Sequence, residues 1–446
     1  MRTCRWMDLQ WQPCWRITLP PLYHRIWMLA WPMMLSNISV PLLGLIDTAI
    51  LGHLPSPRYL AAVALGASLM SFVFSGLNFL RMGTTGFSAQ AFGQQDKTLA
   101  TTRLQQGLLL AGLLGCGLLV LSPLLKNLGL YLLQVPEDIR PLSASYVQIR
   151  FLAAPAVLMN FVIIGWAIGQ QQTRLALITL TASCLLNIAL DYLLIMQLGL
   201  HSDGAAIATV ITEYVSLWLA LHLLNIRFPW LAEMFKASPW LAQLQNAAVY
   251  FQLNKDLFIR STCLLFVFAF FHAQGAKLGT EILAANAILM QLILFQSYLL
   301  DGFANATEAL VGEGQGQRSN QRPILQATAV ASLATALLLC LLLLLIKPWL
   351  LPLFTQQPQV ISLAAQQLVW IIWLPLISVW AYWLDGVAVG KTASRAMRNS
   401  MLLATWGVFI PCWWWFQGMG NRGLWPAFFV FLLSRGVLLL PILRQR

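Results

Sequence analysis

Charged side chains are scarce in this sequence. Only 9% of its 446 residues are charged, whereas a soluble globular domain carries about 25%. Hydrophobic residues make up 59% of the chain. So few charged residues cannot cover the surface of a protein in water. The composition therefore excludes a soluble protein and indicates a membrane protein with many spans.

Residues that bind metals or carry out catalysis are also few. The five histidines and seven cysteines show no spacing typical of a metal site. No paired histidines and no nucleophile beside a base are found, so we expect neither an enzyme nor a resident cofactor. The net charge of +12 is largely explained by basic loops beside a membrane, and a nucleic-acid partner is not needed to account for it.

Twelve apolar stretches are long enough to cross a bilayer as helices, which predicts an all-α integral membrane fold. The predicted spans are about 26–51, 60–83, 104–125, 145–169, 175–198, 204–225, 257–278, 282–304, 324–346, 361–388, 398–417 and 424–443.

Lysine and arginine indicate how these spans are oriented. If both termini are cytoplasmic, the cytoplasmic segments hold seventeen basic residues and the outer loops hold six. Basic residues are retained on the cytoplasmic side of short loops, so this split supports cytoplasmic termini. Residues 1–24 are predicted to be a cytoplasmic extension without a convincing signal peptide.

The chain repeats a pattern of small residues at a nearly constant offset. Gly165 and Gly169 precede Arg174 in a G-x-x-x-G-x-x-x-x-R pattern, and residues 386–395 repeat this pattern 221 positions later. Gly93 and Gly312 end two further spans at an offset of 219. Each match is common where membrane helices pack closely, but together they predict two six-helix halves around a central cavity.

Acidic side chains lie inside apolar spans of the first half. Asp47 interrupts the first span, Asn187 and Asp191 share one helical face, and Thr209 and Glu213 do the same on the next helix. A charged Asp at membrane depth costs roughly 2.5–3.5 kcal/mol on insertion scales, so such residues usually handle an ion, proton or substrate. Crowded acids at low dielectric bind protons more readily, which predicts that Asp47 or Asp191 exchanges a proton near physiological pH.

Structural roles for some of these residues remain open. A membrane Asn is often only an interhelical hydrogen bond, so Asn187 is equally consistent with packing. Thr209 can bond to its own helix backbone, and Glu213 can act as a tether between helices. Asp47 and Asp191 have the strongest case for function.

The second half has its own acids at depth. Asp301 and Asp385 are predicted to line the substrate cavity together with Glu213 of the first half, while Glu308 lies closer to the predicted cytoplasmic end. An acidic cavity with nearby aromatic rings suits an organic cation that has an apolar body. Many of the 19 Trp residues, including Trp413 to Trp415, are better explained as anchors at the membrane interface.

Several segments resemble the multidrug and toxic compound extrusion (MATE) family, and within it the DinF, or DNA-damage-inducible protein F, branch. The resemblance extends from about residue 25 to the C-terminus, and its most specific motif surrounds Asp47. The segments are SNISVPLLGLIDTAILGHL at 36–54, RMGTTG at 81–86, AQAFG at 89–93, NIALD at 187–191 and LDGFA at 300–304.

This resemblance implies an antiporter of the inner membrane that exports cationic amphipathic compounds in exchange for H+ or Na+. The spans and the internal repeat predict an N-terminal lobe at 25–225, a cytoplasmic linker at 226–256 and a C-terminal lobe at 257–446. One chain is expected to build the whole pathway in contact with membrane lipid.

By the same resemblance, the ion-coupling residues are Asp47, Asn187, Asp191 and Thr209. Pro32, fifteen residues before Asp47, lets the first helix bend as the cluster changes its protonation, because proline removes a helical hydrogen bond. Asp385 matches a position used for cation coupling in another branch.

One alternative shares the general architecture. A flippase for lipids or lipid-linked oligosaccharides is expected to place basic residues in its cavity to hold pyrophosphate. Arg81, Arg150 and Arg260 lie near the ends of predicted spans, which favours the exporter. The exported compound and the choice between H+ and Na+ are not determined by the sequence.

Overall fold

The computed structural model describes residues 19–52, 54, 56–237 and 247–444, and within these ranges it contains helices and no strand. Residues 1–18 of the predicted extension and 238–246 of the predicted linker lie outside the described residues.

The N-terminal half is a run of helices in which two of the predicted spans are each built from two helices with a break between them. Asn78 separates α2 from α3, and the chain bends by 49° between α5 and α6. The elements are α1 (Leu19–Gly52), α2 (Pro57–Leu77), α3 (Phe79–Gly93), α4 (Lys97–Leu132), α5 (Arg140–Phe151), α6 (Ala154–Gly169), α7 (Thr173–Asp191), the π-helical η1 (Tyr192–Gln197) and α8 (His201–Arg227).

The C-terminal half follows the short helix α9 (Pro229–Ala237), and in it the counterparts of the two interrupted spans are single continuous helices. Its elements are α11 (Ala248–Lys277), α12 (Thr280–Gly316), α13 (Arg322–Leu350), α14 (Pro358–Gly390), α15 (Ser394–Leu402), the π-helical η2 (Leu403–Phe409), α16 (Ile410–Phe416), the 3-10 turn η3 (Gln417–Met419), α17 (Asn421–Val437) and the 3-10 segment η4 (Leu440–Arg444).

Local sequence signals explain where several helices begin. Asp96 caps α4 by accepting a hydrogen bond from the Leu99 amide at 2.9 Å, and Ser56 caps α2 in the same way. Proline occupies the first turn of α2 and α14, where its missing N–H costs nothing.

The predicted spans correspond to these helices. By length and composition, nine described helices can cross a membrane, or ten when α5 and α6 are counted as one bent span. The 34-residue α1 and the run of α15, η2 and α16 complete the predicted twelve. Large apolar side chains such as Leu121, Tyr131 and Trp415 are exposed on the outer surface, as expected for a face in lipid.

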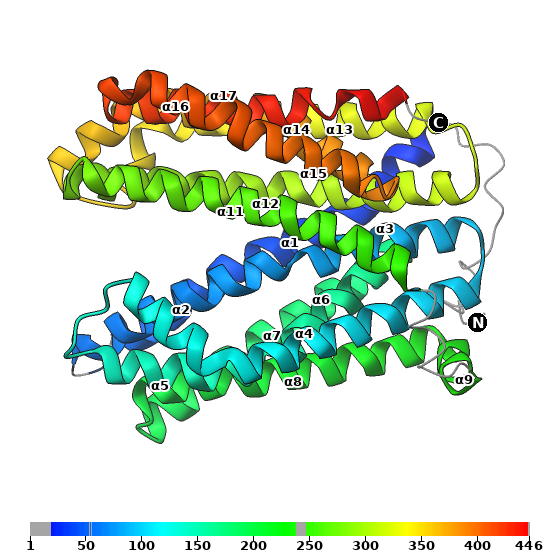
Figure 1. Ribbon diagram of the computed structural model, residues 1–446, viewed down its shortest axis with the longest axis horizontal. Coiled ribbons are helices and arrows are strands. Elements are labelled where there is room, and N and C mark those ends of the chain that lie inside the picture. The colour runs from blue at the N-terminus through cyan, green and yellow to red at the C-terminus, as the bar shows by residue number, and fades with distance from the viewer. Residues whose placement is uncertain (1–18, 53, 55, 238–246, 445–446) are drawn as a thin grey trace, which may run out of the picture.

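The two halves form two adjacent helix groups. In Figure 1 helices α2 to α9 lie below most of those from α11 onward, and α1 runs from the upper group at the right to the lower group at the left. The ribbons of the two groups come closest at the right, where N and C are marked. We call this the termini end. Helix α1 packs against α7 of its own half and against α12 of the other half, so it is in contact with both groups.

The repeated glycines make equivalent contacts in both halves. A Cβ added to Gly165 of α6 would lie 2.3 Å from the Arg81 carbonyl oxygen of α3. In the second half, a Cβ on Gly386 of α14 would lie 2.7 Å from the Ala304 carbonyl oxygen of α12. The pairs α3–α6 and α12–α14 are therefore related by the repeat, which confirms the predicted pseudo-symmetry.

Glycines also bring the halves together at the termini end. A Cβ on Gly93 of α3 would lie 2.1 Å from the Glu313 carbonyl oxygen of α12, and one on Gly312 would lie 2.4 Å from the Cβ of Ala89. These two glycines are repeat partners, and each contacts the other's helix. We call this contact between α3 and α12 the seam.

Candidate functional site

Two predicted carboxylates meet inside the N-terminal half. The carboxyl groups of Asp47 on α1 and Asp191 at the end of α7 interact directly with each other. Apart from this mutual contact, neither oxygen of Asp191 nor Oδ1 of Asp47 has a hydrogen-bond partner among the described residues. Asp191 is only 1% exposed. Buried, unpartnered carboxylate oxygens are costly, and they are available to bind a cation or proton.

The other predicted residues of this region differ in how they are bonded. Asn187 is buried one turn before Asp191, and its amide atoms have no hydrogen-bond partner in the described part of the chain. The Thr209 hydroxyl donates to the Ala205 carbonyl of its own helix at 3.0 Å. Coupling roles for Asn187 and Thr209 stay predictions.

Glu213 is connected to a neighbouring helix. The amide nitrogen of Asn160 on α6 donates to Oε2 of Glu213 on α8 at 3.0 Å and to the Glu213 backbone carbonyl at 3.1 Å. This geometry is that of an interhelical tether, while the carboxylate still adds charge to the region. We define Asp47, Asp191 and Glu213 as the N-terminal acid cluster.

Arg150 is the residue of this region whose role sequence reasoning missed. It lies in the last turn of α5, just before the bend into α6, and its positive charge acts on all three acids of the cluster. Tyr146, one turn earlier on the same helix, contacts its guanidinium. The spacing of four residues between Tyr146 and Arg150 inside a predicted span was the available signal.

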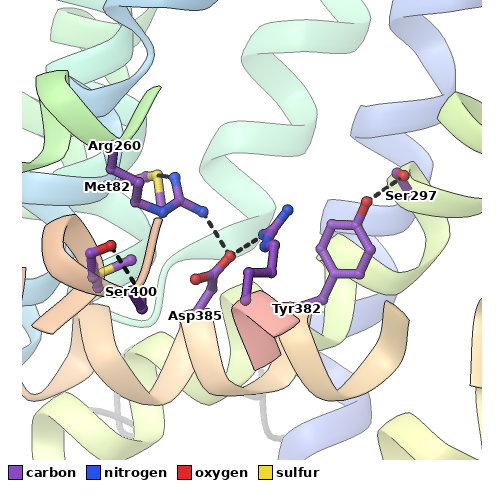
Figure 2. Close-up of polar contacts among 8 residues, drawn as sticks. Met82, Arg260, Ser297, Tyr382, Asp385 and Ser400 are labelled. Carbon is purple, nitrogen blue, oxygen red and sulfur yellow. Dashed lines mark hydrogen bonds and ion pairs between the residues drawn. The ribbon is translucent and has the colours of Figure 1, made fainter. Parts of the chain in front are cut away.

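In the C-terminal half, Asp385 is held by two arginines. Figure 2 shows its carboxylate contacting Arg260 on one side and a second guanidinium on the other, which is that of Arg435. The Arg260 Nη2 to Asp385 Oδ2 distance is 2.6 Å. All three side chains are buried. A carboxylate already in contact with two guanidinium groups has little remaining capacity for a mobile cation.

The position expected for Arg260 was wrong. The predicted span began at residue 257, which placed Arg260 at its end, but α11 begins at Ala248 and holds Arg260 well inside the helix, 6% exposed. The helix extends beyond the apolar window because polar residues of its first turns also pack. Asp256, for example, is fully buried and binds Arg398 at 2.7 Å.

Asp301 and Glu308 lie on α12 near the same arginines. The charge of Arg81 acts on both acids. Arg81 crosses from α3 and donates through Nη1 to Asn305 Oδ1 at 2.8 Å. Cavity roles for Asp301 and Asp385 stay predictions, and Glu308 is 3% exposed in spite of its position toward the termini end.

The two groups of buried acids therefore differ in charge balance. Three acids inside the C-terminal half, Asp301, Glu308 and Asp385, are matched by Arg260 and Arg435 of the same half and by Arg81, which reaches them from α3 of the N-terminal half. The N-terminal acid cluster has three acids and one arginine. Its ionised form carries two uncompensated negative charges, whereas the C-terminal group is neutral.

A polar contact closes the seam at the termini end. Arg25 of α1 pairs with Glu313 of α12 at 2.7 Å, and Gln171, which follows α6, donates to the same carboxylate oxygen at 2.8 Å. Arg25 also donates to Gln171 at 2.7 Å. These three residues, which we call the latch, join the two halves.

We expect Glu313→Gln to open the seam more often. The substitution preserves size but removes the charge that strengthens two hydrogen bonds, an effect of about 1.5–3 kcal/mol that shifts the open-to-closed ratio roughly tenfold or more. Distances between spin labels at Gln94 and Arg322, two exposed sites beside the seam, report the open population. Glu233→Gln on α9, an exposed acid outside the latch, is the control, and an unchanged distance distribution in Glu313→Gln contradicts the prediction.

A cavity of about 600 Å³ lies away from the predicted residues. It opens between the start of α11, the connection from α14 to α15 and Phe87 of α3, and Gln252, Ser394 and Arg395 supply polar groups to its wall. None of the predicted coupling residues lines it, so the acid cluster is not part of this opening.

Comparisons with known proteins agree with this architecture. The MatE family model matches residues 32–193 and 257–415. The chain is 40% identical over 426 residues to the DNA damage-inducible protein F of Escherichia coli, covering 94% of this chain and 92% of that protein. It is 25% identical to the multidrug resistance protein NorM of Vibrio vulnificus strain CMCP6, covering 92% of each.

A solved structure supports the fold independently. It is described as the outward-facing conformation of a multidrug resistance MATE family transporter of the MOP superfamily, and it aligns with a TM-score of 0.81 at 20% identity over 93% of this chain and 94% of that chain. This chain is a multi-pass membrane transporter, not an enzyme, and belongs to the DinF branch of the multidrug and toxic compound extrusion (MATE) family.

Proposed function

We propose that this transporter exports cationic amphipathic compounds in exchange for H+ or Na+, and that the exchange takes place at Asp47, Asn187, Asp191 and Thr209. The observation that carries the proposal is the unequal charge balance of the two groups of buried acids. Of these two groups in the described structure, the N-terminal acid cluster is the one that keeps negative charge not neutralised by a nearby arginine, so a mobile cation or proton is stabilised there.

The exchange works by competition for one set of carboxylates. When H+ or Na+ neutralises Asp47 and Asp191, a cationic substrate loses its electrostatic attraction and leaves. When the ion departs to the other side, the carboxylates again attract the substrate. Coupling requires that ion and substrate have different affinities for the two states of the transporter.

Helix α1 is suited to transmit this change. It carries Asp47, contacts both halves and contains the buried Pro32, whose missing N–H weakens the helix locally. Asn37, between these two residues, donates to the Tyr298 carbonyl of α12 at 3.1 Å. We propose that α1 bends near Pro32 when Asp47 changes its charge and that the contacts with α12 then rearrange.

The proposed orientation places both termini and the latch on the cytoplasmic face of the inner membrane, with a single chain as the working unit. The basic residues at the termini end support this orientation, as does the positive-inside rule. With the latch closed, the transporter faces outward.

The flippase alternative is not favoured, because the relatives named above are multidrug resistance proteins and a DNA damage-inducible protein.

Efflux of ethidium from proteoliposomes under separate gradients tests the proposal. Purified wild-type protein is reconstituted, and ethidium movement is followed under an imposed pH gradient, an imposed Na+ gradient, or neither. We expect one gradient to accelerate efflux at least tenfold over the control without a gradient, which also identifies the coupling ion. No acceleration under either gradient, with folded protein in the bilayer, overturns the exchange mechanism.

A further inference from the structure

Arg150 is placed in a way that needs an explanation. Its Nε and Nη1 atoms are shielded from solvent and have no hydrogen-bond partner among the described residues. Arginines without an ion pair are rare inside membrane spans because burial of their charge is costly. An arginine retained at such a site is therefore expected to serve an electrostatic purpose.

Three acidic side chains surround Arg150 and indicate what this electrostatic role is. Asp47, Asp191 and Glu213 come from three different helices, and the positive charge of Arg150 acts on each of them. Within the described ranges, however, no ion pair of 4.0 Å or less joins Arg150 to any acid. The guanidinium stands close enough to influence the carboxylates and too far away to occupy their oxygen atoms.

The C-terminal half shows the opposite arrangement. There Arg260 and Arg435 touch Asp385 directly and occupy one of its oxygens. In the N-terminal half the arginine contributes charge without contact, so the oxygens of Asp191 remain free of hydrogen-bond partners other than Asp47 in the described structure. Such an arrangement changes the charge of a site without blocking it.

We propose that Arg150 is a fixed internal cation that sets the number of mobile cations needed to neutralise the N-terminal acid cluster at two instead of three. Arginine side chains are permanently charged in proteins, so we treat the contribution of Arg150 as constant through the transport cycle. This role rests on the proposed exchange function and deepens it, because it fixes how many ions the cluster takes up.

Other titratable groups near Arg150 are few. Tyr146 lies on α5 itself, and Cys184 of α7 is influenced by Asp47 and Glu213. Helices α2 and α4 also pack against α5, but within the described structure no charged side chain of these two helices acts on the three acids. The pH response of the site is therefore assigned to the three acids, with Arg150 as a constant charge beside them.

Binding of ethidium to the purified protein, measured as a function of pH, tests this role. Removing the positive charge in Arg150→Gln makes the acids hold protons to higher pH, so ethidium binding begins at higher pH. We expect the midpoint to move upward by about one pH unit, a shift consistent with one charge several ångströms away. Arg150→Lys retains the charge and is expected to keep the wild-type midpoint.

If the Arg150→Gln protein does not fold, a double variant with balanced charge still allows the pH midpoint of ethidium binding to test the proposal. Arg150→Gln combined with Glu213→Gln removes one charge of each sign, so the cluster again needs two cations and its midpoint returns toward that of wild type. A change in the midpoint that is the same for Lys and Gln at position 150, or a double variant that differs from wild type by a full pH unit, overturns the proposal.

The same binding measurement distinguishes failure of the proposed exchange function from failure of the role proposed for Arg150. If ethidium binding to wild type depends on neither pH nor Na+, the exchange mechanism itself is wrong. If wild type depends on pH and Arg150→Gln has the same midpoint, only the role of Arg150 is wrong.

Discussion

Asp191→Asn removes ion-driven ethidium efflux, with a loss of at least tenfold, while the protein folds as wild type does. The amide matches the carboxyl group in size, and Asp191 has no hydrogen-bond partner in the described structure other than its contact with Asp47, so the change breaks no further bond. An amide cannot ionise, so it neither binds a proton nor attracts the cationic substrate. Asp47→Asn is expected to have the same effect, because the two carboxyl groups form one site.

Initial efflux rates in proteoliposomes, together with thermal unfolding of the same samples, check this prediction. Asp138→Asn is the matched control, because Asp138 is an exposed acid whose ion pair with Arg58 is 3.8 Å long and contributes little. The Asp191→Asn protein is expected to unfold at a temperature no lower than wild type, since a buried charge has been removed. Efflux above half the wild-type rate contradicts the coupling role.

Arg435→Gln has the largest expected effect on stability. Removing one partner of a buried ion pair leaves the charge of the other partner uncompensated. Such a loss lowers the free energy of unfolding by about 3–5 kcal/mol. Asp385 keeps Arg260, but the neutral group of three acids and three arginines becomes negative. We expect the midpoint of thermal unfolding in detergent to fall by about 5–10 °C.

Adding Asp385→Asn to Arg435→Gln separates charge from packing. The double variant again balances the group and is expected to recover a substantial part of the lost stability. Arg422→Gln is the control, because Arg422 is exposed and has only a weak contact, 3.4 Å, with Gln366. An Arg435→Gln protein as stable as wild type means that the Asp385 contact is not structural.

The sequence predicted the architecture well for a physical reason. A span must be about 20 apolar residues long, and this requirement can be recognised without knowledge of tertiary structure. The repeated Gly165 and Gly386 motifs also predicted the internal repeat correctly, because each glycine makes the equivalent close helix contact within its own half.

The electrostatic partners were harder to predict. Arg435 contacts Asp385 across 50 residues of chain, and no periodicity reveals such a contact. Arg260 was misplaced because helix α11 continues past its apolar window. Arg150 was recognised only as a residue near a span end, since its influence depends on three helices that converge in space. Spacing on one helix, as for Asn187 and Asp191, was the only side-chain geometry that the sequence supplied.

Under the proposed exchange, the two uncompensated charges of the N-terminal acid cluster also make transport sensitive to voltage. An exchange of two protons for one monovalent organic cation moves one net positive charge across the bilayer in each cycle. The membrane potential then contributes about 2.3 kcal/mol per 100 mV to every turnover, in addition to any pH gradient. A cell that has lost its pH gradient but keeps its interior negative still drives export through such a site.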